Sequence, residues 1–212
     1  MLGWLIDLVL HLDRHLVELL ARYDLWIYPI LFAVIFAETG LVVTPFLPGD
    51  SLLFAVGALA AVDTSGTLRA PLATLLLGLA AVLGNTANYG IGRLIGPAAF
   101  SGRYRWLKVE YLKLTEDFFR RHGAMAIVLS RFMPVVRTCA PFVAGIARMP
   151  YARFLAFNLA GGFAWVVLFV WGGYLFGNIP QVRAHFGLVT LAVIAVSLLP
   201  LLFTLRRAPP AA

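Results

Sequence analysis

Charged residues are scarce in this chain: Asp, Glu, Lys and Arg make up 13% of its 212 residues. Apolar and aromatic residues make up 61%, and the mean hydropathy is +0.89. This balance excludes an ordinary soluble domain and predicts an integral membrane protein. The chain also has a single cysteine, Cys139, which excludes an intramolecular disulfide. At this length we expect one domain.

Acidic residues are fewer than basic ones, with 10 Asp and Glu against 17 Lys and Arg. The net charge of +7 invites a nucleic-acid partner, but seven of the basic residues fall between Arg93 and Arg121, next to apolar segments. We therefore expect a membrane-facing loop there and no nucleic-acid partner. The N-terminus lacks the basic region of a secretory signal and carries Asp7 and Asp13 instead.

Apolar periodicity divides the chain into helical segments. Residues 1–23 predict an amphipathic helix that lies at the membrane interface, because polar residues recur along one of its faces. Residues 24–205 predict a single transmembrane domain, and 206–212 form a short basic tail. Four segments inside the domain are long and apolar enough to span the membrane: 25–44, 71–96, 154–177 and 186–205. Glu38 lies near the end of the first, and the other three are expected to be full spans.

Prolines interrupt two further apolar segments, and proline breaks a helix because it lacks an N–H and clashes with the preceding turn. The first segment, 25–44, is followed by Pro45 and Pro48, and the second contains Pro134 and Pro141. Short apolar arms flank these breaks: Leu52–Ala61, 124–133 and Phe142–Ala147. An arm of about ten residues covers only half of a hydrocarbon core of roughly 30 Å. We therefore predict two re-entrant helical hairpins.

Basic residues orient these segments through the positive-inside rule. The Arg93–Arg121 loop, the Arg148 and Arg153 pair and the basic tail are expected in the cytoplasm, while the linkers 63–70 and 178–185 fit the outside. With these sides assigned, the two hairpins enter the membrane from opposite faces. The predicted fold class is therefore an all-α membrane protein with an inverted repeat, two opposed hairpins and about three full spans.

The two halves also resemble each other in sequence. Phe54–Ala60 in the first half resembles Phe142–Ala147 in the second. Tyr89–Gly96 resembles Trp171–Gly177, and these two segments lie at the ends of predicted spans. The glycines at 90, 92 and 96 have the spacing of a dinucleotide-binding loop, but no strand precedes them. We therefore expect them to allow close packing between membrane helices.

Four ionisable residues lie beside the proline breaks, at the expected depth of the membrane: Glu38, Asp50, Arg131 and Arg137. A charge there costs roughly 2.5–3.5 kcal/mol on insertion scales, so such residues pair with each other or line a wet cavity. Two acids and two arginines beside paired helix breaks therefore predict a transport site. A static ion-pair cluster that only stabilises the fold is the alternative.

Other polar residues give weaker signals. Asn85, Asn88 and Asn158 lie inside predicted spans, where they either line a cavity or form interhelical hydrogen bonds. The apolar segments contain no metal-ligand set and no serine or cysteine with a buried histidine, since all four histidines fall at predicted interfaces or loops. We therefore expect no catalytic residue, no metal site, no cofactor and no enzymatic activity.

Several motifs resemble those of the bacterial DedA family, whose shared region is also called the SNARE-associated or VTT domain. The motifs are Glu38-Thr39-Gly40, Phe46-Leu47-Pro48-Gly49-Asp50, and Arg131-Phe132-Met133-Pro134-Val135-Val136-Arg137 followed by Ala144-Gly145. Asn158 and Gly173-Tyr174 are also family-like, and the resemblance covers about residues 30–180. It implies a multi-pass protein of the bacterial inner membrane. The family's functional acids map to Glu38 and Asp50, and its functional arginines map to Arg131 and Arg137.

The same resemblance implies a function in lipid transport. The chain would move a phospholipid or undecaprenyl phosphate across the membrane, coupled to the proton-motive force, so that a lipid phosphate and protons are its partners. Arg131 and Arg137 would hold the phosphate, and Glu38 and Asp50 would take protons or pair with the arginines. A homo-oligomer is compatible with this expectation. Passive lipid scrambling and an assembly role without transport are alternatives, and an intramembrane enzyme acting on lipid phosphates is disfavoured by the missing catalytic motifs.

Overall fold

The computed structural model describes residues 24–41, 49–101, 109–177 and 179, and every regular element within these ranges is helical. This confirms the predicted all-α class for the described part of the chain. The expected helix at 1–23, the prolines 45 and 48, the expected span at 186–205 and the basic tail lie outside the described residues.

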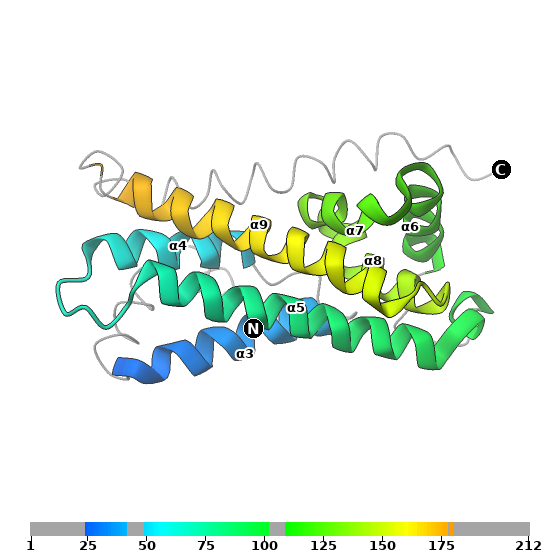
Figure 1. Cartoon of the computed structure of the whole chain (residues 1–212), viewed down its shortest axis with the longest axis horizontal. Coiled ribbons are helices and arrows are strands. Elements are labelled where there is room, and N and C mark those ends of the chain that lie inside the picture. Colours follow the sequence, from blue (N-terminus) through cyan, green and yellow to red (C-terminus); the bar gives the residue numbers. More distant parts are fainter. Residues whose placement is uncertain (1–23, 42–48, 102–108, 178, 180–212) are drawn as a thin grey trace, which may run out of the picture. The chain divides into compact units, whose positions relative to one another are not determined.

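Two helices are long and apolar enough to cross a membrane, α5 (Ala70–Ile95) and α9 (Tyr151–Gly177), drawn in teal and in yellow to orange in Figure 1. They contain 26 and 27 residues. Each is therefore about 40 Å long, which exceeds a hydrocarbon core of roughly 30 Å. The sequence predicts both helices, at 71–96 and 154–177, because their apolar runs are long and contain no internal proline.

Three other apolar helices are shorter. A 3-10 turn at Asp24–Trp26 leads into α3 (Ile27–Gly40), and α4 (Gly49–Val62) follows. Both have 14 residues, and α8 (Pro134–Ile146) has 13. At about 20 Å each, these helices are too short to cross the hydrocarbon core alone. The length of α4 agrees with the short arm expected at Leu52–Ala61. In contrast, α3 is shorter than the span-length segment expected at 25–44, and α8 begins earlier than the arm expected at Phe142–Ala147.

The basic loop is partly helical, as its sequence indicates. It begins with a 3-10 helix (Gly96–Ser101), and α6 (Val109–His122) follows. The side chains of Leu112 and Thr115 are buried on one face of α6, and Leu112 packs in a cluster with Phe142 of α8. Arg120, Arg121 and His122 occupy the last turn, where positive charge complements the helix dipole.

The second predicted break lies at Met133. A 3-10 turn (Gly123–Met125), the short α7 (Ala126–Leu129) and a further 3-10 turn (Ser130–Phe132) precede it. Met133 is extended, with φ −124° and ψ 105°, and α8 begins at the next residue, Pro134. Proline is well suited to the first position of a helix, because the N–H that it lacks has no partner there.

The expectation of a break at Pro141 is wrong, because α8 continues through this residue to Ile146. Its ring removes the hydrogen bond that residue 141 would make to the carbonyl of Arg137. The residues on either side of Pro141 are held by α5, since Asn88 donates a hydrogen bond to Thr138 and the backbone of Phe142 contacts Gly92. Packing of this kind lets membrane helices tolerate an internal proline.

The turn between α4 and α5 is fixed by two polar side chains. Asp63 accepts hydrogen bonds from Ser65, at 2.9 Å from its N–H and 2.6 Å from its hydroxyl, and from the N–H of Leu68 at 2.7 Å. The hydroxyl of Tyr28 in α3 donates to the carbonyl of Thr67 at 3.0 Å and accepts from the N–H of Arg69 at 2.8 Å. The start of α3 is therefore tied to this turn.

The described residues form two units, which we consider separately. Unit 1 contains residues 24–35, 49–80, 163–177 and 179, and unit 2 contains residues 36–41, 81–101 and 109–162. Each unit packs one short helix against the carboxyl-terminal half of a long one. In unit 1 this pair is α4 and α9, and in unit 2 it is α8 and α5.

In unit 1 the backbones of α4 and α9 meet at two glycines. A Cβ on Gly57 would collide with the carbonyl of Val170, and a Cβ on Gly173 would collide with the carbonyl of Phe54. Each glycine follows the contacted carbonyl of its own helix by three residues. Only a residue without a side chain allows this approach, which is common at helix interfaces in membranes.

Unit 2 repeats this contact with the equivalent residues. A Cβ on Gly145 of α8 would collide with the carbonyl of Tyr89, and a Cβ on Gly92 of α5 would collide with the carbonyl of Phe142. The two similar halves of the sequence therefore form the same helix contact, once in each unit. The expectation of close packing is confirmed for Gly92 and wrong for Gly90 and Gly96, where no described residue lies within 4 Å of an added Cβ.

Candidate functional site

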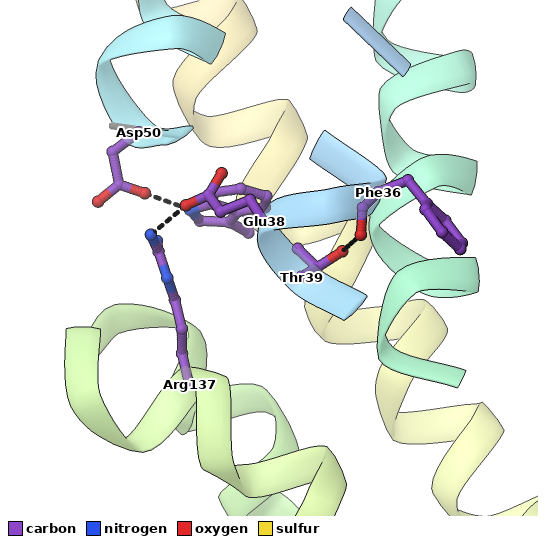
Figure 2. Close-up of polar contacts among 6 residues, drawn as sticks. Phe36, Glu38, Thr39, Asp50 and Arg137 are labelled. Atoms are coloured by element: carbon purple, nitrogen blue, oxygen red, sulfur yellow. Dashed lines mark hydrogen bonds and ion pairs between the residues drawn. The ribbon is translucent and has the colours of Figure 1, made fainter. Parts of the chain in front are cut away.

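A buried ion pair joins the last turn of α3 to the first turn of α8 in unit 2. Nη2 of Arg137 lies 2.5 Å from Oε1 of Glu38. The Glu38 side chain is 2% exposed and that of Arg137 is 13% exposed. Figure 2 shows the two side chains pointing toward each other. Removing one partner would leave the other charge buried without this counter-ion, which is costly.

The break at Met133 sets the position of Arg137. The N–H of Arg137 donates to the carbonyl of Met133 at 2.8 Å, which closes the first turn of α8. Because α8 starts at Pro134, Arg137 lies one turn inside the helix and extends toward α3. The segment from Pro134 to Arg137 therefore places the arginine three residues after the start of α8.

Arg131 lies on the other side of this break and has different partners. It belongs to the 3-10 turn before Met133 and is 3% exposed. Its Nη2 donates to Oδ1 of Asn158 at 3.0 Å and to the carbonyl of Ala81 at 3.5 Å. A Cβ on Gly162 would lie 3.3 Å from the same nitrogen, so the glycine leaves room for the guanidinium. Neutral oxygens of α5 and α9 thus hold this charge.

Two of the predicted asparagines connect α5 with α9. Nδ2 of Asn85 donates to Oδ1 of Asn158 at 2.8 Å, and Nδ2 of Asn158 donates to the carbonyl of Val82 at 3.0 Å. Oδ1 of Asn158 therefore accepts from both Asn85 and Arg131. Asn85 is 3% exposed and Asn158 is 0% exposed. Of the two roles left open by the sequence, the structure shows interhelical hydrogen bonding.

Asn88 makes a separate connection. Its Nδ2 donates to the carbonyl of Thr39 in α3 at 3.3 Å and to the carbonyl of Thr138 in α8 at 2.9 Å. The side chain is 0% exposed. Thr39 and Thr138 directly follow the two residues of the ion pair in the sequence.

Asp50 lies in unit 1, in the first turn of α4, where a carboxylate complements the positive end of the helix dipole. Nε1 of Trp165 donates to its Oδ1 at 2.8 Å. Sequence reasoning identified Asp50 but missed Trp165. A signal was present, because tryptophan usually lies at the ends of membrane helices, whereas Trp165 lies in the middle of α9 and is 1% exposed.

The chain matches the family model described as the VTT domain, over residues 47–175. This range includes α4, α5, α8 and nearly all of α9, and three of the four ionisable residues singled out in the sequence. No solved structure matches the chain.

Curated relatives cover most of the chain. Protein DedA of Escherichia coli (strain K12) is 49% identical over 198 residues, which are 93% of this chain and 90% of the relative. An uncharacterized membrane protein of Mycobacterium tuberculosis (strain H37Rv) is 41% identical over 182 residues, with 85% and 79% covered. The inner membrane protein YqjA of Escherichia coli (strain K12) is 37% identical over 155 residues, with 73% and 69% covered.

Proposed function

This chain belongs to the DedA family of membrane proteins, which share the VTT domain, and on that premise we propose that it moves an anionic lipid across the membrane. The cargo is a lipid phosphate, either undecaprenyl phosphate or a phospholipid, and the movement is coupled to the proton-motive force. One relative is named an inner membrane protein, and we propose the same location for this chain.

The ion pair between Glu38 and Arg137 is the observation that carries this proposal. A phosphate, like a carboxylate, is an anion that accepts bidentate hydrogen bonds from an arginine, so it competes with Glu38 for Arg137. A proton on Glu38 removes the charge that holds Arg137 and makes the guanidinium available to the lipid. Proton uptake and phosphate binding would then be linked at one contact 2.5 Å long.

Arg131 and Asp50 take supporting roles in the proposal. Arg131 is held in place by Asn158 and the carbonyl of Ala81, and it supplies a second guanidinium for the phosphate across the break at Met133. Asp50 is the second proton-binding residue, and its indole partner orients the carboxylate in unit 1. The short helices α4 and α8 act as arms of two re-entrant hairpins that enter from opposite faces, in keeping with their lengths and their repeated packing.

The test is movement of labelled lipid in proteoliposomes that contain the full chain. The lipids are labelled undecaprenyl phosphate and a labelled anionic phospholipid, each with and without an imposed pH gradient. We expect transport of one of them to rise with the gradient. Movement that ignores the gradient would indicate a passive scramblase, and no movement of either lipid would favour an assembly factor.

Variants at the ionisable residues sharpen this test. Glu38→Gln and Asp50→Asn mimic the protonated acids permanently, so each should insert normally and lose the response to the gradient. Arg131→Lys and Arg137→Lys keep the charge but lose the planar fork, so each should reduce transport severalfold at normal protein levels. Glu116→Gln and Arg120→Lys on exposed positions of α6 are matched controls. Wild-type activity in both lysine variants would contradict bidentate phosphate binding.

A further inference from the structure

One face of α5 is built from three residues at steps of four: Gly84, Asn88 and Gly92. Residues spaced in this way lie above one another on the same side of a helix. All three make contacts within unit 2, and these contacts concern the two helices that carry the ion pair.

The two glycines bring α3 and α8 onto this face. A Cβ on Gly84 would collide with the hydroxyl of Thr39 and would lie 2.8 Å from the carbonyl oxygen of Phe36, both in the last turns of α3. A Cβ on Gly92 would collide with the carbonyl of Phe142 in α8. Both α3 and α8 therefore pack against this face of α5, with α3 and α8 approaching the glycine backbone directly.

Asn88 lies between the two glycines and bonds to both helices through one nitrogen. Its Nδ2 donates to Thr39, next to Glu38, and to Thr138, next to Arg137, at 3.3 and 2.9 Å. Thr39 is in the last turn of α3, whose carbonyls receive no donor from the helix itself. Both N–H groups of a single amide thus hold the two backbone segments from which the ion pair extends.

From this geometry we propose that Asn88 is a positioning residue for the ion pair between Glu38 and Arg137. It sets the separation of α3 and α8 at the level where the two side chains meet, and this fixes the contact at 2.5 Å. Asn88 touches neither charged group through the bonds described, so it acts through the backbone of their neighbours. Its consequence for lipid movement rests on the proposed function, whereas its consequence for the ion pair does not.

The two N–H groups of the Asn88 side chain, and not its oxygen, would position the ion pair. Its Oδ1 has no hydrogen-bond partner among the described residues, while both bonds of Nδ2 are made. A leucine is similar in size and removes the two N–H donors without taking away a bond at the oxygen. Asn88→Leu therefore removes the two hydrogen bonds and keeps a side chain of similar size. Asn88→Ala removes the same two bonds with a shorter side chain that adds no methyl groups near the threonine carbonyls.

The experiment is a double-mutant cycle on the ion pair, measured by thermal unfolding of the full chain in detergent. Glu38→Gln, Arg137→Gln and the double variant give the coupling between the two side chains. The cycle is then repeated in the Asn88→Leu and Asn88→Ala backgrounds. We expect the coupling to fall to less than about half of its original value in both, because without the two N–H donors α3 and α8 can separate far enough to break the direct hydrogen-bonded contact between the two side chains.

Thr86→Val is the matched control, since Thr86 lies on α5 and its hydroxyl bonds only to Val82 of the same helix among the contacts described. We expect the coupling to be unchanged in this background. Unchanged coupling in both Asn88 variants would overturn the proposal, as would an equal loss in Thr86→Val. Because this readout needs no transport, a wild-type protein that moves no lipid would refute the proposed function and leave the role of Asn88 to be decided by the cycle.

Discussion

Burying the charge of Glu38 or Arg137 without an opposite charge would cost free energy, and the ion pair between them reduces that cost. A single charge at membrane depth costs roughly 2.5–3.5 kcal/mol, whereas a hydrogen-bonded pair is neutral as a unit. Loss of one partner therefore lowers the stability of the inserted protein more than loss of both. The double variant Glu38→Gln, Arg137→Gln separates the two roles, because inactivity in a stable double variant indicates a role in transport rather than in folding.

Trp165 makes a contact that a conservative substitution can isolate. Trp165→Phe keeps an aromatic ring in α9 and removes the N–H that donates to Asp50. We expect a loss of about 1–2 kcal/mol in stability, because hydrogen bonds to carboxylates are stronger than neutral ones. Thermal unfolding in detergent measures the loss. Trp171→Phe is the matched control on the same helix, where the ring contacts Tyr174, and equal losses in both variants would contradict the importance of the bond to Asp50.

Asp63 predicts a pH dependence at the turn before α5. Burial alone would raise the pKa of its carboxyl, but hydrogen bonds from the Ser65 hydroxyl and from neighbouring N–H groups lower it below the usual 3.8. Since the folded-state pKa is the lower one, the carboxylate stabilises the fold above pH 3.8, and this contribution disappears as the pH falls through the folded-state pKa.

Asp63→Asn should therefore be less stable than wild type by about 1 kcal/mol at neutral pH, with the gap closing in strongly acidic solution. Melting temperatures of both proteins, compared from neutral pH down to below 3.8, check this expectation. Asp117→Asn, at an exposed position of α6, should show no such convergence. A gap that stays constant over the whole range would argue against the ionised carboxylate as its source.

At the scale of helices, the repeated glycine contacts predict a pattern of tolerance. Gly57→Ala in α4 and Gly145→Ala in α8 place a methyl group against a backbone carbonyl, and we expect each to cost about 1–3 kcal/mol. The methyl groups of Gly90→Ala and Gly172→Ala meet nothing within 4 Å in the part of the chain that the structure describes. These two should be neutral or stabilising by about 0.5–1 kcal/mol, because alanine favours a helix. Thermal unfolding of the four variants is the measurement, and similar effects in both groups would refute the packing described.

The helices themselves follow closely from the sequence, and the reasons differ among them. Long apolar runs without an internal proline predict α5 and α9 to within three residues at each end. The start of α8 at Pro134 follows from the chemistry of proline, but its continuation through Pro141 does not. A local rule cannot foresee that α5 holds the segment on both sides of the second proline.

The site is less predictable than the helices. Each ionisable residue is recognisable because charge is rare in an apolar chain, and Arg137 was expected to have an acidic partner. The partners of Asp50 and Arg131 were not foreseeable, because Trp165 and Asn158 are far away in the sequence and reach them only through the pairing of helices. The asparagines show the same limit, since a polar residue inside a span gives no indication of which backbone it will bind.

For the whole molecule, the distribution of Lys and Arg predicts which loops face the cytoplasm. In a Cys139→Ala background, a cysteine at Thr64 should react with a membrane-impermeant reagent in intact cells. A cysteine at Tyr151, which is 43% exposed, should react only after permeabilisation, because it follows the basic residue Arg148. Lys113→Cys on α6 is a second cytoplasmic marker. Reaction of positions 64 and 151 from the same side would refute the opposed hairpins.

The pairing of short and long helices also sets an order of events during synthesis. When α8 leaves the ribosome, its partner α5 has already been made, whereas α4 needs the end of α9, which follows more than one hundred residues later. At about 5–20 residues per second, α4 waits roughly 6 to 20 seconds for that surface. During this time its glycine face and Asp50 lack their final neighbours in α9. The nascent protein therefore passes through a stage in which one half of the repeat is assembled and the other is exposed to the insertion machinery, to lipid or to chaperones.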